Sequence, residues 1–251
     1  MITDPWFYIC AVPAVLLFGM AKGGLGGGLA MLSVPLMSLA VSPITAAAIL
    51  LPILLVMDAV AVQSFWKKWS KPHLKACIPG AVVGVVVGMF TFRYLSEDWI
   101  RLLIGMISLG FCLHFWLSPK LSANSKWQGL AGPFWGSVAG FTSFGIHAGG
   151  PPISIYLLPQ RLDKVTLMAS FAGFFAVVNL LKVGPYIWLG QFDTQVISTA
   201  LVLVPLAPIG VKLGVFLLHR IDEAWIYRLC YLALFAVGVR LSLQGAGGLL
   251  G

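Results

Sequence analysis

The stretch GMAKGGLGGG, residues 19–28, places six glycines and one lysine inside an otherwise apolar part of the chain. A second break, GIHAGGPP at residues 145–152, has the matching place in the second half. The apolar segment after each break, 27–40 or 150–159, is too short to cross a bilayer, which takes about 20 helical residues. Membranes tolerate backbone groups freed by glycine only where they line a cavity or contact protein. The sequence therefore predicts two glycine-broken or re-entrant short helices, and each break is a candidate site.

The composition around these breaks indicates a membrane protein. Of the 251 residues, 59% are hydrophobic and 10% are charged, whereas soluble proteins carry about 25% charged residues. The mean hydropathy is +0.96. Hydropathy and helix breakers divide the chain into ten apolar segments, at residues 6–20, 27–40, 43–65, 74–94, 99–117, 128–145, 150–159, 165–189, 195–218 and 223–243. We therefore predict an all-α polytopic membrane protein.

Three other interpretations of these features fail. Segment 6–20 could be taken for a signal peptide, but Asp4 precedes it and no basic leader or small-residue cleavage site is present, so we expect a retained first helix. The net charge of +8 lies in short loops rather than on one face, which argues against nucleic acid as a partner. The four cysteines lie in apolar segments without CxxC pairing, so we predict no disulfide framework, no metal site and no cofactor.

The two halves of the chain align with each other. The offset between matching positions stays between 121 and 126. The aligned pairs are Gly27 with Gly149, Gly28 with Gly150, Thr45 with Thr166, Asp58 with Asn179, Gly84 with Gly210, Gly88 with Gly214 and Trp99 with Trp225. Chance similarity between apolar helices would not keep the offset so steady, so we predict an internal duplication. Residues 1–122 form the first transmembrane repeat and residues 123–251 the second.

Basic residues in the loops predict how the repeats lie in the membrane. Lysine and arginine accumulate in cytoplasmic loops, and they crowd the loops at residues 67–75, 120–126, 161–164 and 220. The opposite loops carry balanced charges, with Arg93 and Arg101 against Glu97 and Asp98, and Lys182 against Asp193. Both termini then face outside. Each half crosses the membrane an odd number of times, which inverts the second half relative to the first, as in many secondary transporters.

Short motifs at both breaks resemble those of a known family. VPL at residues 34–36 follows the first glycine run, and GFTSFG at 140–145 leads into GGP at 149–151. In these motifs the chain resembles the sulfite exporter (TauE/SafE) family of membrane permeases, and both halves resemble the family's duplicated domain. The resemblance implies export or uptake of sulfite, sulfonates or related small organic anions, and we expect a bacterial inner (plasma) membrane location. The second break has His147 and Ala148 in place of glycines, so equal roles for the two copies do not follow.

The starts of the short helices after the breaks are candidate anion sites. Proline suits a first helical turn because its missing N–H is not needed there. A helix N-terminus carries unpaired N–H donors and about half a positive charge. Two such ends meeting near the midplane would bind an anion, and the alternative is close helix packing through small residues. The predicted substrate-binding residues at the breaks are Gly26, Gly27, Gly28, Ser143, Gly149, Gly150 and Pro151.

A basic residue accompanies each break. Lys22 lies beside the first glycine run, and a lysine inside a helical bundle is costly unless it is paired or serves an anion. We predict that it supplies positive potential to the substrate, and the alternative is that it reaches the cytoplasmic surface. His147 lies in the second break, where it could donate to an anion or take a proton near neutral pH. The alternative for His147 is a satisfied interfacial histidine.

Three further polar residues are candidates for coupling or charge pairing. Asp58 and Asn179 correspond in the two repeats and lie deep in apolar segments, where an acid is usually functional. Asp58 would either bind a coupling proton or neutralise Lys22 or Lys212. A structural hydrogen bond to a broken helix explains Asn179 equally well. Lys212 has no basic counterpart in the first repeat, and we predict that it contacts the anion or pairs with Asp58.

Together these features favour a transporter. The sequence contains no HExxH motif, no GxSxG motif and no paired intramembrane aspartates, so we do not expect an enzyme. Inverted repeats with broken helices suit alternating access, which predicts a secondary-type transporter for a small anion. An anion channel and a thiol-assisted carrier of sulfur compounds are the alternatives. The sequence leaves open proton coupling and assembly as a homodimer.

Overall fold

The computed structural model describes residues 1–25, 27–117, 128–217 and 223–250, and every regular element in these ranges is helical. The first half contains α1 (Pro5–Met20), a π-helical turn η1 (Ala21–Leu25), α2 (Gly27–Ala30), α3 (Ser33–Met37), α4 (Pro43–Ser64), α5 (Lys71–Tyr94) and α6 (Glu97–Leu117). The second half contains α7 (Gln128–Ile146), α8 (Gly150–Leu157), a 3-10 turn η2 (Leu158–Gln160), α9 (Lys164–Trp188), α10 (Thr194–Leu203), α11 (Leu206–Leu217) and α12 (Glu223–Leu250). The predicted all-helical architecture is confirmed. Gly26, Lys120, Lys126 and Arg220, on which predictions above rest, lie outside the described residues.

Several of these helices are long and apolar enough to cross a membrane. Within the described ranges they are Pro5–Leu25, Pro43–Ser64, Lys71–Tyr94, Lys164–Trp188 and Tyr231–Leu250, and α10 with α11 makes a sixth if this pair, bent by 42°, counts as one. The protein is therefore a polytopic integral membrane protein. We expected one continuous segment at residues 195–218, but the structure divides it at Pro205 because proline lacks the N–H that a continuous helix needs.

Side-chain caps fix where four of the helices begin. The caps are Asp4 for α1, Ser42 for α4, Asp163 for α9 and Asp193 for α10. Each side chain accepts a hydrogen bond from a first-turn N–H that has no partner inside the helix. The Asp163 carboxylate accepts two, at 3.0 and 3.1 Å. The two central helices, α4 and α9, thus both start at a defined residue.

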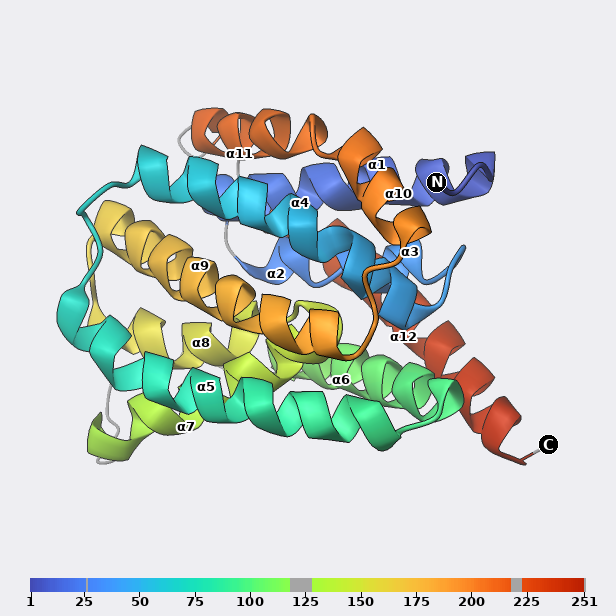
Figure 1. The fold of residues 1–251 in the computed structure, drawn as a ribbon. Helices are drawn as coiled ribbons and strands as arrows, with labels where there is room; N and C mark the ends of the chain where they lie inside the picture. Colours follow the sequence, from blue (N-terminus) through green and yellow to red (C-terminus); the bar gives the residue numbers. More distant parts are fainter. Residues whose placement is uncertain (26, 118–127, 218–222, 251) are drawn as a thin grey trace.

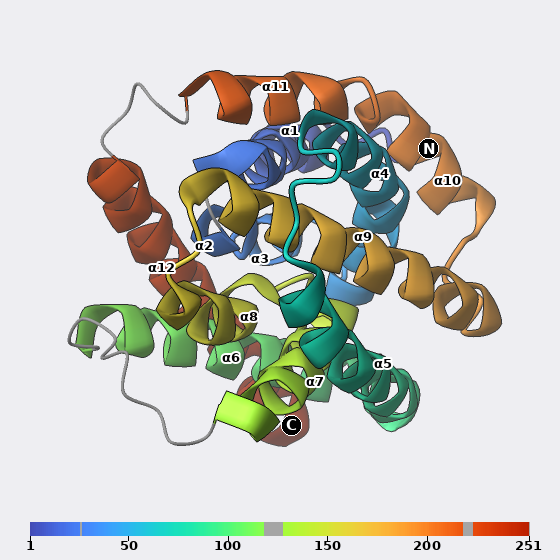
Figure 2. The same ribbon diagram turned by 90° about the vertical axis from the view of Figure 1, so that its left-hand side faces the viewer.

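The helices are arranged around the pair α4 and α9, which run side by side through the middle of the molecule (Figure 1). On one side of this pair α1 packs against α11, and on the other side α5 packs against α7. Figure 2 shows the same order from the end, with α6 lying against α12. Each of these packed pairs joins one helix from the first half of the chain to one from the second half.

Glycines bring the outer helix pairs into backbone contact. A Cβ atom added to Gly19 of α1 would lie 2.8 Å from the Cα of Gly210 in α11. Between α5 and α7, a Cβ atom on Gly84 would lie 2.7 Å from the backbone nitrogen of Phe141, and one on Gly140 would lie 2.9 Å from the Cα of Ala81. No side chain fits at these separations. Close packing through small residues, the alternative considered for the glycines at the breaks, is the observed role of these particular glycines.

Both predicted breaks are present in the interior. Gly24 in η1 has φ 131°, which glycine adopts readily because it has no Cβ. His147, between α7 and α8, has φ 54°, an uncommon value for a residue with a side chain. The short helices α2 and α8, which follow the two breaks, contact each other. The breaks of the two halves therefore meet inside the bundle.

One charged residue lies where it was not predicted. We expected Lys182 in an outer loop, where its charge would balance Asp193. The structure instead places it within α9, and its exposed fraction is 0%. The helix continues to Trp188, so a residue near the end of the apolar segment is still inside the bundle. Lys182 consequently does not contribute to the loop charges from which the orientation was predicted.

Candidate functional site

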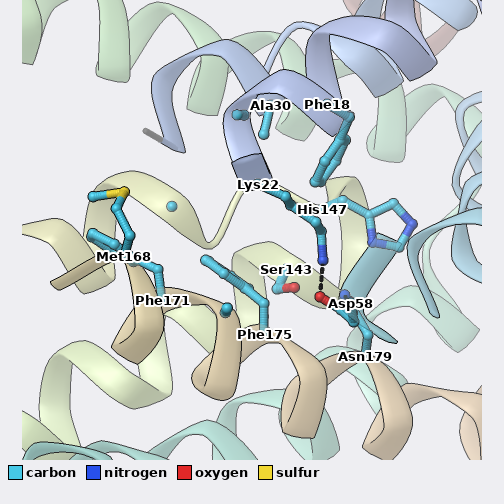
Figure 3. A pocket seen from close by; sticks show the side chains of 13 residues that line it. Phe18, Lys22, Ala30, Asp58, Ser143, His147, Met168, Phe171, Phe175 and Asn179 are labelled. Atoms are coloured by element: carbon cyan, nitrogen blue, oxygen red, sulfur yellow. Dashed lines mark hydrogen bonds and ion pairs between the residues drawn. The ribbon is translucent and has the colours of Figure 1, made fainter. Parts of the chain in front are cut away.

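A buried cavity lies where the two breaks meet. Its volume is about 40 Å³, whereas a single water needs roughly 10–15 Å³ of such space, so the cavity has room for a small ion. Both halves contribute to its wall (Figure 3). The lining residues are Phe18, Ala21, Lys22, Ala30 and Asp58 from the first half and Ser143, His147, Gly150, Met168, Phe171, Ala172, Phe175 and Asn179 from the second.

An ion pair lies at one end of this cavity. The Lys22 ammonium of η1 is hydrogen-bonded to Oδ1 of Asp58 in α4, as Figure 3 shows, and both side chains are buried. Asn179 of α9 donates from Nδ2 to the other carboxylate oxygen, Oδ2, at 2.6 Å. Buried charges need such partners because removal from water is costly for each ion. The pair therefore ties the first break to both central helices.

Aromatic rings surround the Lys22 ammonium. Its Nζ lies 5.7 Å from the ring centroid of Phe18 and 5.8 Å from that of Phe175. The face of an aromatic ring attracts a cation at these distances. Phe171 and Met168, from the same helix as Phe175, extend this apolar wall along the cavity (Figure 3). The site thus combines one buried cation with an apolar surface.

A second buried lysine contacts two residues that line the cavity. Lys182 Nζ donates to the backbone oxygen of Ser143 at 2.9 Å and to its Oγ at 3.1 Å, and lies 2.6 Å from Nδ1 of His147. Nearby, the hydroxyl of Tyr186 donates to the backbone oxygen of Phe144 at 2.7 Å. These bonds hold α9 to the carboxyl end of α7, so the lysine is fixed by the second break as Lys22 is fixed by the first.

The hydrogen bonds of His147 define its protonation. Its Nε2 lies 2.9 Å from the backbone oxygen of Ala47, and a carbonyl oxygen only accepts, so Nε2 carries a proton. Nδ1 then accepts from the Lys182 ammonium, or donates to Lys182 when the lysine is neutral. In each arrangement both ring nitrogens are engaged within the protein. His147 therefore has no ring N–H left over for an anion in this arrangement.

Most of the predicted site residues meet at the cavity. Lys22, Asp58, Ser143, His147, Gly150 and Asn179 line it. Gly27 and Gly28 begin α2, Gly149 precedes the first residue of α8, and Pro151 lies in the first turn of α8. Because Pro151 and Pro152 have no N–H, the donors that the start of α8 can offer are those of Gly149 and Gly150.

Lys212 lies apart from these residues. It is exposed on α11, whereas the carboxylate of Asp58 is occupied by Lys22 and Asn179. Of the two lysines named as partners for Asp58, the structure brings Lys22 to it.

Sequence reasoning missed Lys182 and the aromatic wall. A helical projection would have found the lysine, because positions 175, 179 and 182 are spaced by four and three residues and share one face of α9. Phe175 and Asn179 on that face line the cavity. Met168 and Phe171 share this face too, but they do not stand out from the sequence, and neither does Phe18, because apolar residues are common throughout this chain.

The chain is similar to known membrane transport proteins over most of its length. The family model described as "Sulfite exporter TauE/SafE" matches residues 11–241. The chain is 27% identical over 226 residues to "Probable sulfite/organosulfonate exporter TauE" of Cupriavidus necator, covering 87% of each chain. It is 26% identical over 173 residues to "Probable inner membrane transporter protein TsaS" of Comamonas testosteroni, covering 66% of this chain and 70% of that protein. These relatives are named as transporters rather than enzymes, and no solved structure matches the chain. With its two broken helices and a match over most of its length, the chain belongs to the sulfite exporter TauE/SafE family of membrane transport proteins.

Proposed function

We propose that this protein is a secondary-type transporter that carries a small sulfur oxyanion, sulfite or an organosulfonate, across the bacterial inner membrane by alternating access. One observation carries the proposal. The cavity where the two breaks meet has the buried Lys22 side chain on its wall, within a chain of a sulfite exporter family. A buried ammonium next to an unfilled space is suited to a small anion.

The polar part of the cavity suits an oxyanion head. The Lys22 ammonium, the Ser143 hydroxyl and the N–H groups of Gly149 and Gly150 lie at or beside it. Charge-assisted hydrogen bonds are stronger than neutral ones, and more so where water is excluded. Together these donors can replace the water that an anion loses on entry.

The apolar part of the cavity suits the carbon chain of a sulfonate. Phe171, Phe175 and Met168 line it without offering a strong hydrogen-bond donor or acceptor. An organic anion with a short apolar tail would bury that tail against these side chains, whereas sulfite would leave them in contact with water. The same site therefore accepts both kinds of substrate that the family description and the relatives' names suggest.

The helix contacts support two inverted repeats, residues 1–122 and 123–251. Suppose that α1 of the first half corresponds to α7 of the second, and that α5 corresponds to α10 with α11. Exchanging the two halves then replaces the packed pair α1–α11 with the pair α7–α5, and that pair is packed as well. The same exchange leaves the pairs α4–α9 and α6–α12 unchanged. This pattern is what two halves related by a two-fold axis in the membrane plane would give, and such repeats underlie alternating access in many transporters. We place both termini outside, as the loop charges predict.

Asp58 is the proposed site of proton coupling. Asn179 donates to the carboxylate, while its own Oδ1 has no hydrogen-bond partner among the described residues. An amide that flips by 180° can accept a hydrogen bond from a carboxylic acid through its oxygen, just as its NH₂ group donates one to a carboxylate. Asp58 can thus take up a proton without losing Asn179, and its protonation would release the Lys22 ammonium for the substrate.

The thiol-assisted alternative finds less support. Cys10, Cys77 and Cys112 are buried, and none of them lines the cavity. A thiol that exchanges with a sulfur compound has to reach it. We therefore do not assign these three cysteines a role in transport.

Flux measurements with purified protein in liposomes test the proposal. We expect saturable uptake of radiolabelled sulfite and competition by short alkanesulfonates. Preloading the liposomes with unlabelled sulfite should accelerate the uptake, because a carrier exchanges its substrates. Non-saturable flux without this acceleration would indicate a channel, and no flux of either anion would reject the proposed substrate class.

A further inference from the structure

Lys182 is a buried cation without an acidic partner. It has no exposed surface, and among the described residues no carboxylate lies within ion-pair distance of it. Its hydrogen bonds go to Ser143 and His147, which are uncharged groups of the second break when the lysine is protonated. Burying a lysine in such a place destabilises the protein. Its presence there therefore indicates a role other than stabilising the fold.

The alignment of the two repeats relates Lys182 to Lys22. The offset that pairs Asp58 with Asn179 also pairs Gly19 with Gly140 and Gly24 with Gly145. Under the same offset, Ser143 occupies the position of Lys22. Serine cannot supply a positive charge, yet the Lys182 ammonium lies on its hydroxyl and its backbone oxygen. Each break therefore has one lysine Nζ at or beside the aligned position 22 or 143. In the first half the lysine belongs to η1, and in the second half it belongs to α9.

The contact also orients the Ser143 hydroxyl. Its Oγ accepts from Lys182, and an ammonium has only donors, so the single hydroxyl proton must point elsewhere. Ser143 lines the cavity. The hydroxyl can then donate to an anion there, and the neighbouring ammonium strengthens that donor.

We propose that Lys182 is the second half's counterpart of Lys22: a positioning residue that, when protonated, makes Ser143 a hydrogen-bond donor to the substrate and adds positive potential to the site. This inference rests on the proposed function and extends it to the residues that bind the substrate.

Binding of methanesulfonate to purified, detergent-solubilised variants tests Lys182 directly. Lys182→Met keeps the length of the side chain and removes the charge, and we expect it to weaken binding by about tenfold or more. Lys182→Arg should retain more of the affinity than Lys182→Met. The matched control is Lys75→Met, because Lys75 is exposed on α5 and should leave affinity within about twofold. Folding is checked by gel filtration and thermal unfolding.

Moving the charge is the sharper experiment. In the double variant Ser143→Lys with Lys182→Met, the ammonium comes from the backbone position that corresponds to Lys22, and it should recover most of the affinity lost in Lys182→Met. A structural role of Lys182 in holding α9 to α7 predicts no recovery. If Lys182→Met fails to fold, Lys182→Arg and the double variant still decide, because the proposal requires both to bind methanesulfonate.

Three outcomes separate this inference from the proposed function. Wild-type affinity in folded Lys182→Met, with binding lost in Lys22→Met, would overturn the role of Lys182 and keep the transporter. A double variant that folds but binds no better than Lys182→Met would also overturn it. Failure of the unaltered protein to bind methanesulfonate or sulfite would instead reject the proposed function.

Discussion

Asp58 and Asn179 occupy equivalent positions in the two aligned halves of the chain, and they are hydrogen-bonded to each other at 2.6 Å between α4 and α9. In a repeated structure, a residue can touch its own equivalent only near the axis that relates the repeats. The proposed two-fold relation between the halves predicts a contact of this kind. It also places the proposed coupling residue at the centre of the molecule rather than on one side of it.

The first prediction concerns Asp58. Asp58→Asn has nearly the same shape but cannot bind a coupling proton, so it should abolish accumulation driven by a proton gradient and leave substrate exchange intact. Both activities are measured in the same proteoliposomes, with and without an imposed gradient. Accumulation equal to that of the unaltered protein would remove Asp58 from the coupling mechanism.

Lys22 should affect binding and stability in separable ways. Lys22→Met leaves the Asp58 charge buried without its cation, which typically costs about 3–5 kcal/mol. The double variant Lys22→Met with Asp58→Asn removes both charges and should recover much of that loss, measured as the free energy of unfolding. Sulfite affinity, measured by titration, should stay at least about tenfold weaker in both variants. Recovered affinity in the double variant would show that Lys22 serves only to neutralise Asp58.

Gly149 should not tolerate a larger side chain. A Cβ atom there would lie 2.7 Å from the backbone oxygen of Ala139, 3.0 Å from the ring of Phe175 and 3.1 Å from the Cβ of Ser143. Gly149→Val therefore displaces two cavity residues, and overpacking of this kind costs about 1–3 kcal/mol. We expect loss of sulfite binding in protein that still folds. Gly184→Val is the control, because Gly184 has open space around it, and equal binding in the two variants would contradict the prediction.

The orientation of the chain is testable by chemical labelling. Single cysteines near each terminus and in the loop at residues 67–75, introduced into a cysteine-free background, should react with a membrane-impermeant thiol reagent from opposite sides. We expect the two terminal sites to be labelled in intact cells and the loop site only after permeabilisation. Labelling of all three sites from one side would contradict the inverted arrangement of the repeats.

The polar centre of the site was largely predictable because polarity is rare in this chain. Asp58, Asn179 and Lys22 stand out within apolar segments, and the repeat offset relates the first two. Lys182 did not stand out, since a lysine near the end of an apolar segment is normally at the membrane surface. Its burial depends on where α9 ends and on the bonds from Tyr186 and Lys182 to the end of α7. Those are tertiary contacts that no local pattern encodes.

The breaks show a similar limit. Glycine runs predicted that the helices are interrupted, and the structure confirms the interruptions. The sequence could not separate the glycines that contact another helix, such as Gly19 and Gly140, from those that lie at the cavity, such as Gly150. The bend at Pro205 was missed because the residues around it are as apolar as the rest of the segment. Packing partners, rather than local composition, decide these roles.

The glycine contacts described above also constrain how the molecule can move. Backbones that touch at Gly19 and Gly210, or at Gly84 and Phe141, have no side chains between them to rearrange. If the cavity opens by the proposed alternating access, we expect α1 to move with α11 and α5 with α7. The contact of α4 with α9 lies between these two pairs, and Asp58 is hydrogen-bonded to Asn179 across it. A proton taken up by Asp58, as proposed, would therefore change a bond that joins the two central helices.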